Sequence, residues 1–355
     1  MDKLAKFSLS LLLQKGIGSS SFKKLLSKFG DIDSLFENKS ISDLNLKIIK
    51  ALSKAKADMN RMDSYIDKYK VSMVFIWQDN YPLLLKEIPD APAVLFYLGD
   101  LESINWDKSI SIVGTRKYTD YGKRITTEFT KDIVSAGFAT VSGMALGIDS
   151  IVHKQTLKDN GRTVAVLASS AHIPTPESNR SLYKSILDSN GVIISETFPH
   201  QNVLPGMFAQ RNHLIAGLTK ATLVTEAPIK SGSLITANLA FEYNRLVYAV
   251  PGDIYRESII GNNNLIKQNI AKLVNISGDL LEDFGLESQK IQRKLPIGLT
   301  KEGKSIYDLL SSKPKSIDEM GQESGIDINN LIKICFELEI QGILNKRLDG
   351  KYSLS

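Results

Sequence analysis

Residues 109–149 read SISIVGTRKYTDYGKRITTEFTKDIVSAGFATVSGMALGID, and the fold class follows from this stretch. An apolar run at 109–113 ends in Gly114, an amphipathic segment covers 121–136, and a second apolar run occupies 139–142. Strand, helix and strand in this order are typical of a βαβ unit, in which a covering helix joins two parallel strands. The sequence therefore predicts a parallel sheet with a glycine-containing turn after one of its strands.

The same alternation of strand and helix signals continues through the middle of the chain. The strand runs are mostly apolar, so each strand is expected to be buried on both faces. The sequence therefore predicts an α/β fold, an extended Rossmann-like parallel sheet with helices on both sides. Further strand runs lie at 71–76, 163–167, 192–195, 222–225 and 246–250, and further helical stretches lie at 148–158 and 234–244.

Two outer blocks flank this predicted core of residues 71–285. Residues 1–70 show helical spacing of apolar residues and predict a helical domain. Residues 286–297 are polar and aperiodic, which predicts a linker. Residues 298–355 predict a winged helix, because three helical stretches precede two short runs around Asp349-Gly350, a strong hairpin signal.

Composition places the chain among ordinary globular proteins, with 43% hydrophobic and 23% charged residues in 355. A single cysteine, Cys335, excludes an internal disulfide and a CxxC metal site. The sequence contains no apolar run of the roughly 18 residues that a membrane helix needs. The apolar run at 7–13 is short and interrupted by serines, which indicates a first helix rather than a signal peptide. We therefore expect a cytoplasmic protein without membrane insertion.

The net charge of +5 is unevenly distributed along the chain. Residues 1–70 carry 14 Lys+Arg against 8 Asp+Glu, residues 71–285 carry 19 against 21, and residues 286–355 carry 11 against 10. The excess positive charge therefore lies in the N-terminal block, outside the predicted core. A polyanion bound by the core must be held by a local pocket built from Arg116, Arg211 and helix N-termini, not by bulk charge.

Four loops at predicted strand ends carry glycine, serine or arginine. Gly114-Thr115-Arg116 leads toward a helix, whose backbone N–H groups form an anion site while the guanidinium offers a planar fork for phosphate. The same residues also fit a plain strand-to-helix turn with a surface arginine. Because parallel strands end at one edge of a sheet, all four loops are expected to face one crevice. The other three contain Ser142-Gly143, Phe208 with Arg211-Asn212, and Ser231-Gly232-Ser233.

Each loop also has an ordinary structural interpretation. Phe208 offers a base-stacking face beside Arg211, or else it belongs to the core while Arg211 pairs with a carboxylate. Ser231 fits a helix N-cap, which explains one serine but not the whole loop. The loops match neither a P-loop nor a dinucleotide fingerprint, and the four histidines lack metal-ligand spacing. We therefore assign no catalytic residue, cofactor or metal.

Together these motifs resemble the DprA/Smf family of bacterial DNA-processing proteins, over residues 81–274. The resemblance is interrupted at 168–174, where ASSAHIP replaces the family's usual Gly-Cys-Gly loop and Tyr-Pro, and near 268–270, where the usual Gly-Ala is absent. The matching stretches are VGTR at 113–116, SGMALGID at 142–149, ISE at 194–196, RN at 211–212, EA at 226–227, SGSLITA at 231–237, AVPG at 249–252 and GNNNLI at 261–266.

The resemblance implies an extended Rossmann-like domain that binds and protects single-stranded DNA in a positively charged pocket. It also implies a homodimer that loads the RecA recombinase onto incoming DNA during natural transformation. Many family members carry an N-terminal helical domain of the sterile-alpha-motif or helix-hairpin-helix type and a C-terminal winged helix. In this chain Arg116 would contact phosphate and Phe208 would stack on a base. The other pocket residues would be Gly114, Thr115, Ser142, Gly143, Arg211, Asn212, Ser231, Gly232 and Ser233.

An enzymatic alternative remains open at this point. Related Rossmann-like folds include phosphoribohydrolases, which cleave nucleotides with a glycine-rich phosphate loop and acidic residues. Glu226, just before the Ser231 loop, is a candidate acid, although the Pro-Gly-Gly-x-Gly-Thr loop of those enzymes is absent.

The outer blocks carry weaker signals. The Gly16-Ile17-Gly18 turn, followed by Lys23 and Lys24, looks like a helix-hairpin-helix turn and predicts either an auxiliary DNA phosphate contact or a purely structural turn. In the predicted winged helix, the third helical stretch at 328–341 carries one lysine and two glutamates. Contact with a protein is therefore at least as well supported there as DNA reading.

Overall fold

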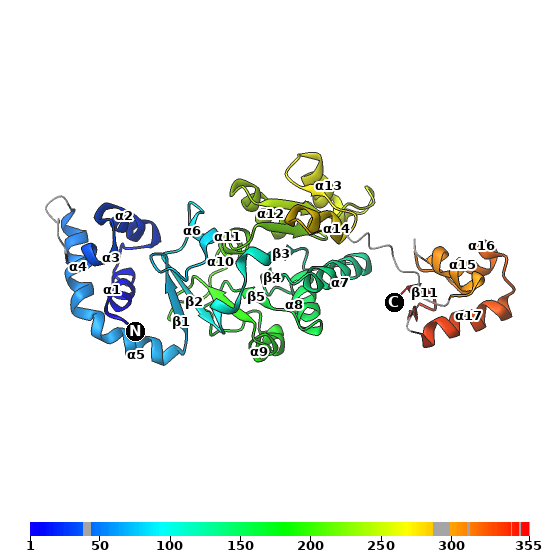
Figure 1. Cartoon of the computed structure of the whole chain (residues 1–355), viewed down its shortest axis with the longest axis horizontal. Coiled ribbons are helices and arrows are strands. Elements are labelled where there is room, and N and C mark those ends of the chain that lie inside the picture. Colours follow the sequence, from blue (N-terminus) through cyan, green and yellow to red (C-terminus); the bar gives the residue numbers. More distant parts are fainter. Residues whose placement is uncertain (38–43, 287–298, 311–312, 342, 348, 355) are drawn as a thin grey trace. The chain divides into compact units, whose positions relative to one another are not determined.

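The computed structural model describes residues 1–37, 44–286, 299–310, 313–341, 343–347 and 349–354. The chain divides into two compact units, Met1–Leu286 and Glu287–Ser355, whose elements are labelled in Figure 1. The predicted linker at 286–297 lies, apart from its first residue, outside the described residues. In the described part of the chain, no helix combines the length and apolarity needed to cross a membrane.

The first unit is built around a nine-stranded sheet in the order β1-β2-β6-β5-β4-β3-β7-β8-β9. The strands from β3 to β9 run parallel, while β2 pairs antiparallel with both β1 and β6. This sheet confirms the predicted α/β class, and every predicted strand run is present; β2 and the two-residue β9 were not predicted. The strands are β1 (Ser72–Phe75), β2 (Val94–Leu98), β3 (Ser109–Val113), β4 (Ala139–Ser142), β5 (Thr163–Val166), β6 (Val192–Ser195), β7 (Ala221–Val224), β8 (Leu246–Ala249) and β9 (Lys272–Leu273).

The order in which strands join the sheet reverses at β3. From β3 the chain adds β4, β5 and β6 toward one edge, and then β7 pairs with the other side of β3. Such a switch point leaves a crevice beyond the carboxyl ends of the two strands, because their loops diverge there. The loops that begin at residues 114 and 225 leave the sheet at this crevice, so the topology brings two of the predicted motifs together.

Helices cover both faces of the sheet. They are α6 (Leu83–Lys86), α7 (Asp120–Ser135), α8 (Ile148–Lys158), α9 (Arg180–Asp188), α10 (Met207–Gln210), α11 (Asn212–Gly217), α12 (Gly232–Glu242), α13 (Ile260–Lys267) and α14 (Ser277–Leu281). On one face, Ile112 of β3 packs in a cluster with Phe129 of α7 and Val152 of α8. On the other, the Ser111 hydroxyl donates a hydrogen bond to the Ile215 carbonyl of α11 (2.7 Å). Alternating strand residues therefore serve opposite layers.

The N-terminal helices pack against this sheet domain within the same compact unit. They are α1 (Lys3–Leu12), α2 (Ser19–Phe29), α3 (Ile32–Glu37), α4 (Leu46–Asp58) and α5 (Met62–Tyr69). The indole N–H of Trp77 donates to the Ser8 hydroxyl (3.1 Å), and the Ala93 N–H donates to the Ser19 hydroxyl (3.1 Å). The predicted helical block is thus present, while a domain boundary at 70/71 stays a prediction.

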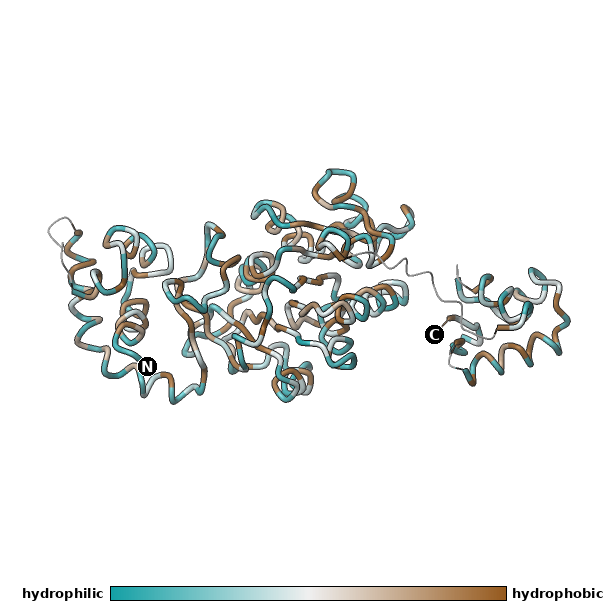
Figure 2. The backbone as a smooth tube through the Cα atoms, viewed as in Figure 1, coloured by the Kyte–Doolittle hydropathy of each residue, from teal (hydrophilic) through white to brown (hydrophobic). Residues whose placement is uncertain are grey.

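The second unit contains three helices and a two-stranded antiparallel sheet, in the predicted order. They are α15 (Lys301–Leu310), α16 (Ile317–Ser324), α17 (Ile328–Ile340), β10 (Leu344–Lys346) and β11 (Tyr352–Leu354). Along α17, hydrophobic and hydrophilic residues alternate in Figure 2. One apolar side of α17, with Leu331 and Leu338, is buried, whereas Phe336 is 62% exposed. Its identity as a winged helix stays a prediction.

Candidate functional site

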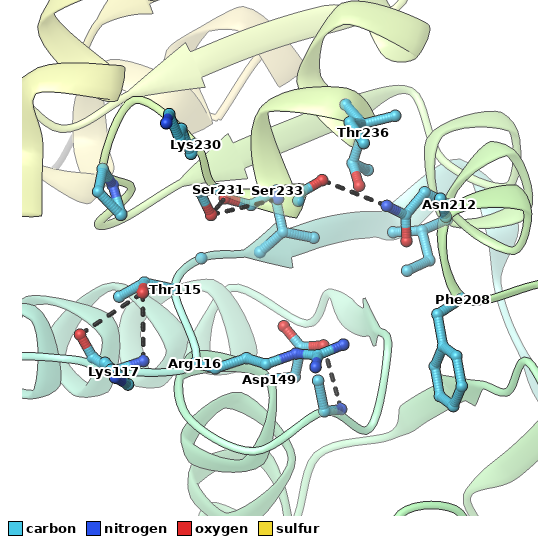
Figure 3. Close-up of a pocket in the computed structure, with 18 of the residues that line it drawn as sticks. Thr115, Arg116, Lys117, Asp149, Phe208, Asn212, Lys230, Ser231, Ser233 and Thr236 are labelled. Atoms are coloured by element: carbon cyan, nitrogen blue, oxygen red, sulfur yellow. Dashed lines mark hydrogen bonds between the residues drawn. The ribbon is translucent and has the colours of Figure 1, made fainter. Parts of the chain in front are cut away.

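A pocket of about 740 Å³ lies beyond the carboxyl ends of β3 and β7 (Figure 3). Its lining comes from the loop after β3, the start of α8, the α10–α11 segment, the loop into α12 and the loop after β8. The structure thus brings together residues that are more than 100 positions apart in the sequence. The predicted pocket residues that line it are Gly114, Thr115, Arg116, Phe208, Arg211, Asn212, Ser231, Gly232 and Ser233.

The exposed edge of this pocket carries positive charge and one aromatic ring. We call it the pocket rim, which consists of Arg116, Lys117, Phe208, Lys230, Ser231 and Gly232. Arg116 and Lys117 lie in the loop after β3, Lys230 precedes α12, and all three side chains are exposed. Arg116 extends across the pocket in the direction of the half-buried Phe208 (Figure 3). The rim therefore places cations on two sides of a recess with an aromatic face in its wall.

Glu226 fixes the loop that carries Arg116. The Thr115 N–H donates to the Glu226 carbonyl (2.7 Å), while the Thr119 N–H and hydroxyl donate to the Glu226 carboxylate (2.9 and 2.6 Å). The carboxylate is fully buried, and an added Cβ on Gly122 would overlap it. Glu226 thus binds the N-terminus of α7 and is not part of the pocket lining.

The N-terminus of α12 faces the pocket. The Ser231 hydroxyl caps this helix by accepting the Ser233 N–H (3.3 Å) and lies 2.7 Å from the Ser233 hydroxyl. The Asn212 side-chain amide donates to the Gly232 carbonyl (3.2 Å), which ties α11 to this turn. An added Cβ on Gly232 would meet open space. Backbone N–H groups at such a helix start are ready to bind an anion.

Beneath the rim, polar groups are buried and bonded to one another. We call this part the pocket floor, formed by Ser142, Gly143, Asp149 and Arg211. Arg211 is 6% exposed, and its guanidinium donates to the carbonyls of Gly143 and Val166. An added Cβ on Gly143 would lie 2.6 Å from Arg211 Nη1 and 2.7 Å from Asp149 Oδ2. Only glycine therefore fits between the arginine and the carboxylate.

The two floor charges compensate each other. Burial lowers the pKa of Arg211 to about 10, with Asp149 acting against that shift and Arg116 adding to it. Burial raises the pKa of the Asp149 carboxyl, and Arg211 opposes that change. Of the four floor residues, Asp149 and Arg211 line the pocket, whereas the predicted Ser142 and Gly143 lie behind that lining, with the Ser142 hydroxyl donating to the Ile112 carbonyl (2.7 Å). The exposed positive charge of the pocket consequently lies on the rim.

The departure from the family pattern at 168–174 lies outside the pocket lining. His172 forms a hydrogen bond with the Ser170 hydroxyl (2.9 Å), and its ring lies 5.2 Å from that of Tyr69 in α5. This segment therefore meets the N-terminal helices rather than the ligand recess.

The predicted auxiliary contact in the N-terminal block is only partly accessible. Gly16 has a positive φ of 90° and Gly18 caps α2, so both belong to a tight turn between α1 and α2. The Lys23 ammonium donates to the Pro89 carbonyl of the sheet domain (2.9 Å), whereas Lys24 is exposed.

Several lining residues escaped the sequence analysis. Lys117 and Lys230 directly adjoin predicted motifs, so flanking basic residues were the signal that would have found them. Glu257 and Ser258 come from the loop after β8, of which only the AVPG stretch at 249–252 carries a recognisable motif. Among the residues that the structure describes, no group of three or more His, Cys, Asp or Glu side chains could hold a metal ion.

A Rossmann-like sheet with a cation-rimmed pocket at its switch point defines a class of proteins that bind nucleotides or nucleic acids through phosphate. The model of the DNA recombination-mediator protein A family matches residues 72–285, more than half of the chain. The chain therefore belongs to this family, which confirms the resemblance found in the sequence.

Curated relatives share most of the sheet domain. The chain is 36% identical over 296 residues to Protein Smf of Synechocystis sp., covering 79% of this chain and 74% of that protein. It is 37% identical over 214 residues to DNA processing protein DprA of Bacillus subtilis, covering 60% of this chain and 71% of that protein.

Two solved structures share the fold. DNA processing protein A of Streptococcus pneumoniae superposes with a TM-score of 0.67 at 29% identity, over 78% of this chain and 97% of that one. DNA processing protein A of Helicobacter pylori superposes with a TM-score of 0.55 at 27% identity, over 61% and 95%. The Helicobacter structure is described in terms of its single-stranded DNA binding mode.

Proposed function

We propose that this protein binds single-stranded DNA in the pocket at the switch point and performs no chemistry on it. The observation that carries the proposal is the convergence of exposed Arg116, half-buried Phe208 and the N-terminus of α12 on one recess. Rim cations and helix N–H groups bind phosphates, and Phe208 stacks on an unpaired base. The single-strand binding described for the Helicobacter relative supports the same interpretation.

A single strand suits this recess better than a duplex. A flexible strand can turn its phosphates toward Arg116 and Lys230 while it presents one base to Phe208. A duplex keeps its bases stacked and paired, so it offers no free base face to an aromatic side chain. The rim contains no array of side chains on a helix or ribbon that would enter a major groove, within the part of the chain that the structure describes.

The central experiment compares Arg116→Ala with Arg162→Ala. Arg162 is also exposed but precedes β5, at the opposite edge of the sheet from the pocket. Arg116→Ala should weaken binding to single strands of any sequence and flatten the slope of log affinity against log salt by about 0.7 for each phosphate that is no longer neutralised. Arg162→Ala should change neither quantity. Unchanged affinity and slope for Arg116→Ala would remove the pocket assignment.

A second experiment tests the base contact. Phe208→Ala should lower the affinity for single strands about 5- to 100-fold, which corresponds to the loss of one stacked base. Gel shifts with matched single- and double-stranded oligonucleotides provide the comparison. Equal binding of the duplex would contradict the single-strand assignment.

The enzymatic alternative has less support. Glu226, its candidate acid, is fully buried, bonded to Thr119 and absent from the pocket lining. Incubation with nucleoside monophosphates should release no free base, and turnover would favour the alternative.

We further propose that the bound strand is protected and passed to a RecA-type recombinase, and that the protein acts as a homodimer. The family's description as a recombination mediator supports this step. Adding the protein should shorten the lag of recombinase ATPase activity on single strands coated with single-strand-binding protein. Light scattering should give twice the chain mass of 39.3 kDa.

The outer parts of the chain receive separate proposals. We propose residues 1–70 and 71–285 as distinct domains and 298–355 as a winged helix that contacts a protein, because α17 exposes Ile332 and Phe336. Lys24 with the Gly16–Gly18 turn is the proposed auxiliary DNA contact, to which Lys23 contributes less because its ammonium binds Pro89. Because the proposed partner of residues 298–355 is a protein, their deletion should leave single-strand affinity unchanged.

A further inference from the structure

Three neighbouring loops at the pocket edge repeat one pattern, and the last of them carries it outside the pocket lining. Each places an exposed apolar or aromatic side chain directly beside an exposed cation. The exposed fractions are 44% for Tyr118, 59% for Ile229 and 88% for Tyr255. We call these pairs the loop dyads: Lys117–Tyr118, Ile229–Lys230 and Tyr255–Arg256.

The loop dyads form a row that is continuous with the pocket. They follow β3, β7 and β8, which are adjacent parallel strands, so successive loops begin only about 4.8 Å apart along the sheet edge. Lys117 and Lys230 line the pocket themselves. Glu257, directly after the third dyad, lines it as well. The third dyad therefore lies in the loop next to the pocket lining, in the direction in which a strand would leave the pocket toward β8.

Tyr255 is exposed on an anchored loop. The Gly252 N–H donates to the Asn263 side-chain oxygen (3.2 Å), and the Asn263 amide donates back to the Gly252 carbonyl (3.0 Å). The Tyr121 hydroxyl donates to the Pro251 carbonyl (2.9 Å), and the Tyr255 N–H donates to Asp253 Oδ1 (3.0 Å). The backbone beside Tyr255 is thus anchored, while its ring, which is 88% exposed, is accessible to a ligand.

The charges beside Tyr255 are mixed, with Arg256 between the exposed carboxylates of Asp253 and Glu257 in the sequence. Arg256 lies 3.7 Å from Asp253, and both side chains are more than half exposed, so the guanidinium keeps room for a second anion. Burial raises the pKa of the Tyr121 hydroxyl, Arg124 and Arg256 oppose that change, and Glu226 and Glu128 add to it, so charges of both signs lie near this loop. The Glu226 carboxylate already accepts two hydrogen bonds from Thr119.

We propose that the third dyad extends the single-stranded DNA site beyond the pocket, so that Tyr255 stacks on a base and Arg256 binds a phosphate there. This inference rests on the proposed function of the pocket. An aromatic ring beside a cation, as in Tyr255–Arg256, matches a strand that alternates bases and phosphates. A protein partner would instead favour a contiguous apolar patch with lysine excluded from its centre.

The test uses strands of two lengths, oligothymidines of about 6 and about 20 nucleotides. Tyr255→Ala should leave the affinity for the short strand unchanged and lower that for the long strand about 5- to 100-fold, the loss of one stacked base. Tyr255→Phe should restore the long-strand affinity. Leu83→Ala is the control, since Leu83 is 68% exposed on α6, which packs at the Gly217 end of α11, away from the pocket.

Failure of this inference is distinguishable from failure of the pocket assignment. If Arg116→Ala weakens both strands while Tyr255→Ala weakens neither, only the extension beyond the pocket is overturned. If Arg116→Ala has no effect either, the pocket itself is overturned. A change of oligomeric mass in Tyr255→Ala without a change of DNA affinity would mark the surface as a protein interface and also overturn the proposal. Fluorescence of 2-aminopurine placed along the long strand should show one quenched position that Tyr255→Ala releases.

Discussion

The floor and the rim of the pocket come from the same few loops but differ in how their polar groups are used. On the floor, Arg211 and Asp149 are buried and bonded to protein groups, and a glycine is the only residue that fits between them. On the rim, Arg116 is exposed and Gly232 faces open space. The floor thus gives the recess its shape, while the rim is left for the ligand. Changes on the floor should therefore cost stability, and changes on the rim should cost affinity.

The largest effect is expected for Asp149→Ala. Removing this carboxylate leaves the Arg211 guanidinium buried without its compensating charge, which costs about 3–5 kcal/mol of unfolding free energy. Urea denaturation followed by circular dichroism measures the loss. A stability within about 0.5 kcal/mol of the parent would show that the floor charges are not coupled.

A double-mutant cycle tests the coupling itself. Arg211→Met alone should also destabilise, and the double variant with Asp149→Ala should lose less than the two single losses added together. Strict additivity would contradict a coupled pair on the floor.

A matched pair of glycine substitutions separates floor from rim directly. Gly143→Ala inserts a methyl group between Arg211 and Asp149 and should cost about 1–3 kcal/mol of stability. Gly232→Ala meets open space at the first position of α12, so stability should be equal or slightly higher, while the methyl enters the pocket and lowers single-strand affinity. Denaturation and fluorescence anisotropy on the same two proteins give both quantities. Equal stability losses would show that floor and rim do not differ in this way.

Ser231 is expected to contribute both to stability and to DNA affinity, and two substitutions separate these contributions. Ser231→Ala removes the N-cap of α12 and should cost about 1 kcal/mol of stability as well as affinity. Ser231→Asp keeps a capping oxygen, so stability should be retained, but its negative charge on the rim should repel phosphate. A tighter complex with Ser231→Asp would contradict phosphate binding at this helix end.

The smallest effect is a drift of stability with pH. His213, beside Asn212, is buried, with Nε2 3.1 Å from Glu196 and Nδ1 3.1 Å from Asp90. Burial lowers the pKa of His213, but Glu196 and Asp90 outweigh it and raise the pKa overall. The pKa of His213 in the folded protein thus exceeds the unfolded value of about 6.5. The stabilisation from its charged contacts is therefore complete below pH 6.5 and is lost as pH rises through the folded pKa. The unfolding free energy should therefore fall more steeply toward alkaline pH in the parent than in His213→Gln, and equal slopes would contradict the ion-pair network.

The fold and most pocket positions could be predicted from the sequence because their signals are local. Buried parallel strands are apolar throughout, and each is followed by a short loop of glycine, serine or arginine, so strand ends and loop chemistry appear together along the chain. The loop after β8 was incompletely recognised, since its lining residues lie several positions beyond the strand end. The strand β2 pairs antiparallel and lies outside the alternating pattern, which is why it was missed.

The division between a buried floor and an exposed rim could not be predicted from the sequence. Arg116 and Arg211 both follow glycine- or aromatic-rich motifs, yet one is exposed and the other is buried. What separates them is that the fold brings Arg211 beside the 142–149 segment, where Gly143 and Asp149 lie, and this proximity exists only in the folded chain. The same holds for Glu226, whose position in a motif resembles that of a catalytic acid but whose carboxylate is bonded to Thr119.

The hydrogen bonds of Glu226 to Thr115 and Thr119 also affect how much conformational entropy the protein loses on binding its ligand. Its carbonyl holds Thr115 and its carboxylate holds Thr119, so the three residues between them, including Arg116, are tethered at both ends by one side chain and one backbone group. A loop that is already fixed loses little conformational entropy when a strand arrives, and that loss is otherwise a substantial part of the cost of association. The β3 loop thus meets its ligand in a conformation set during folding.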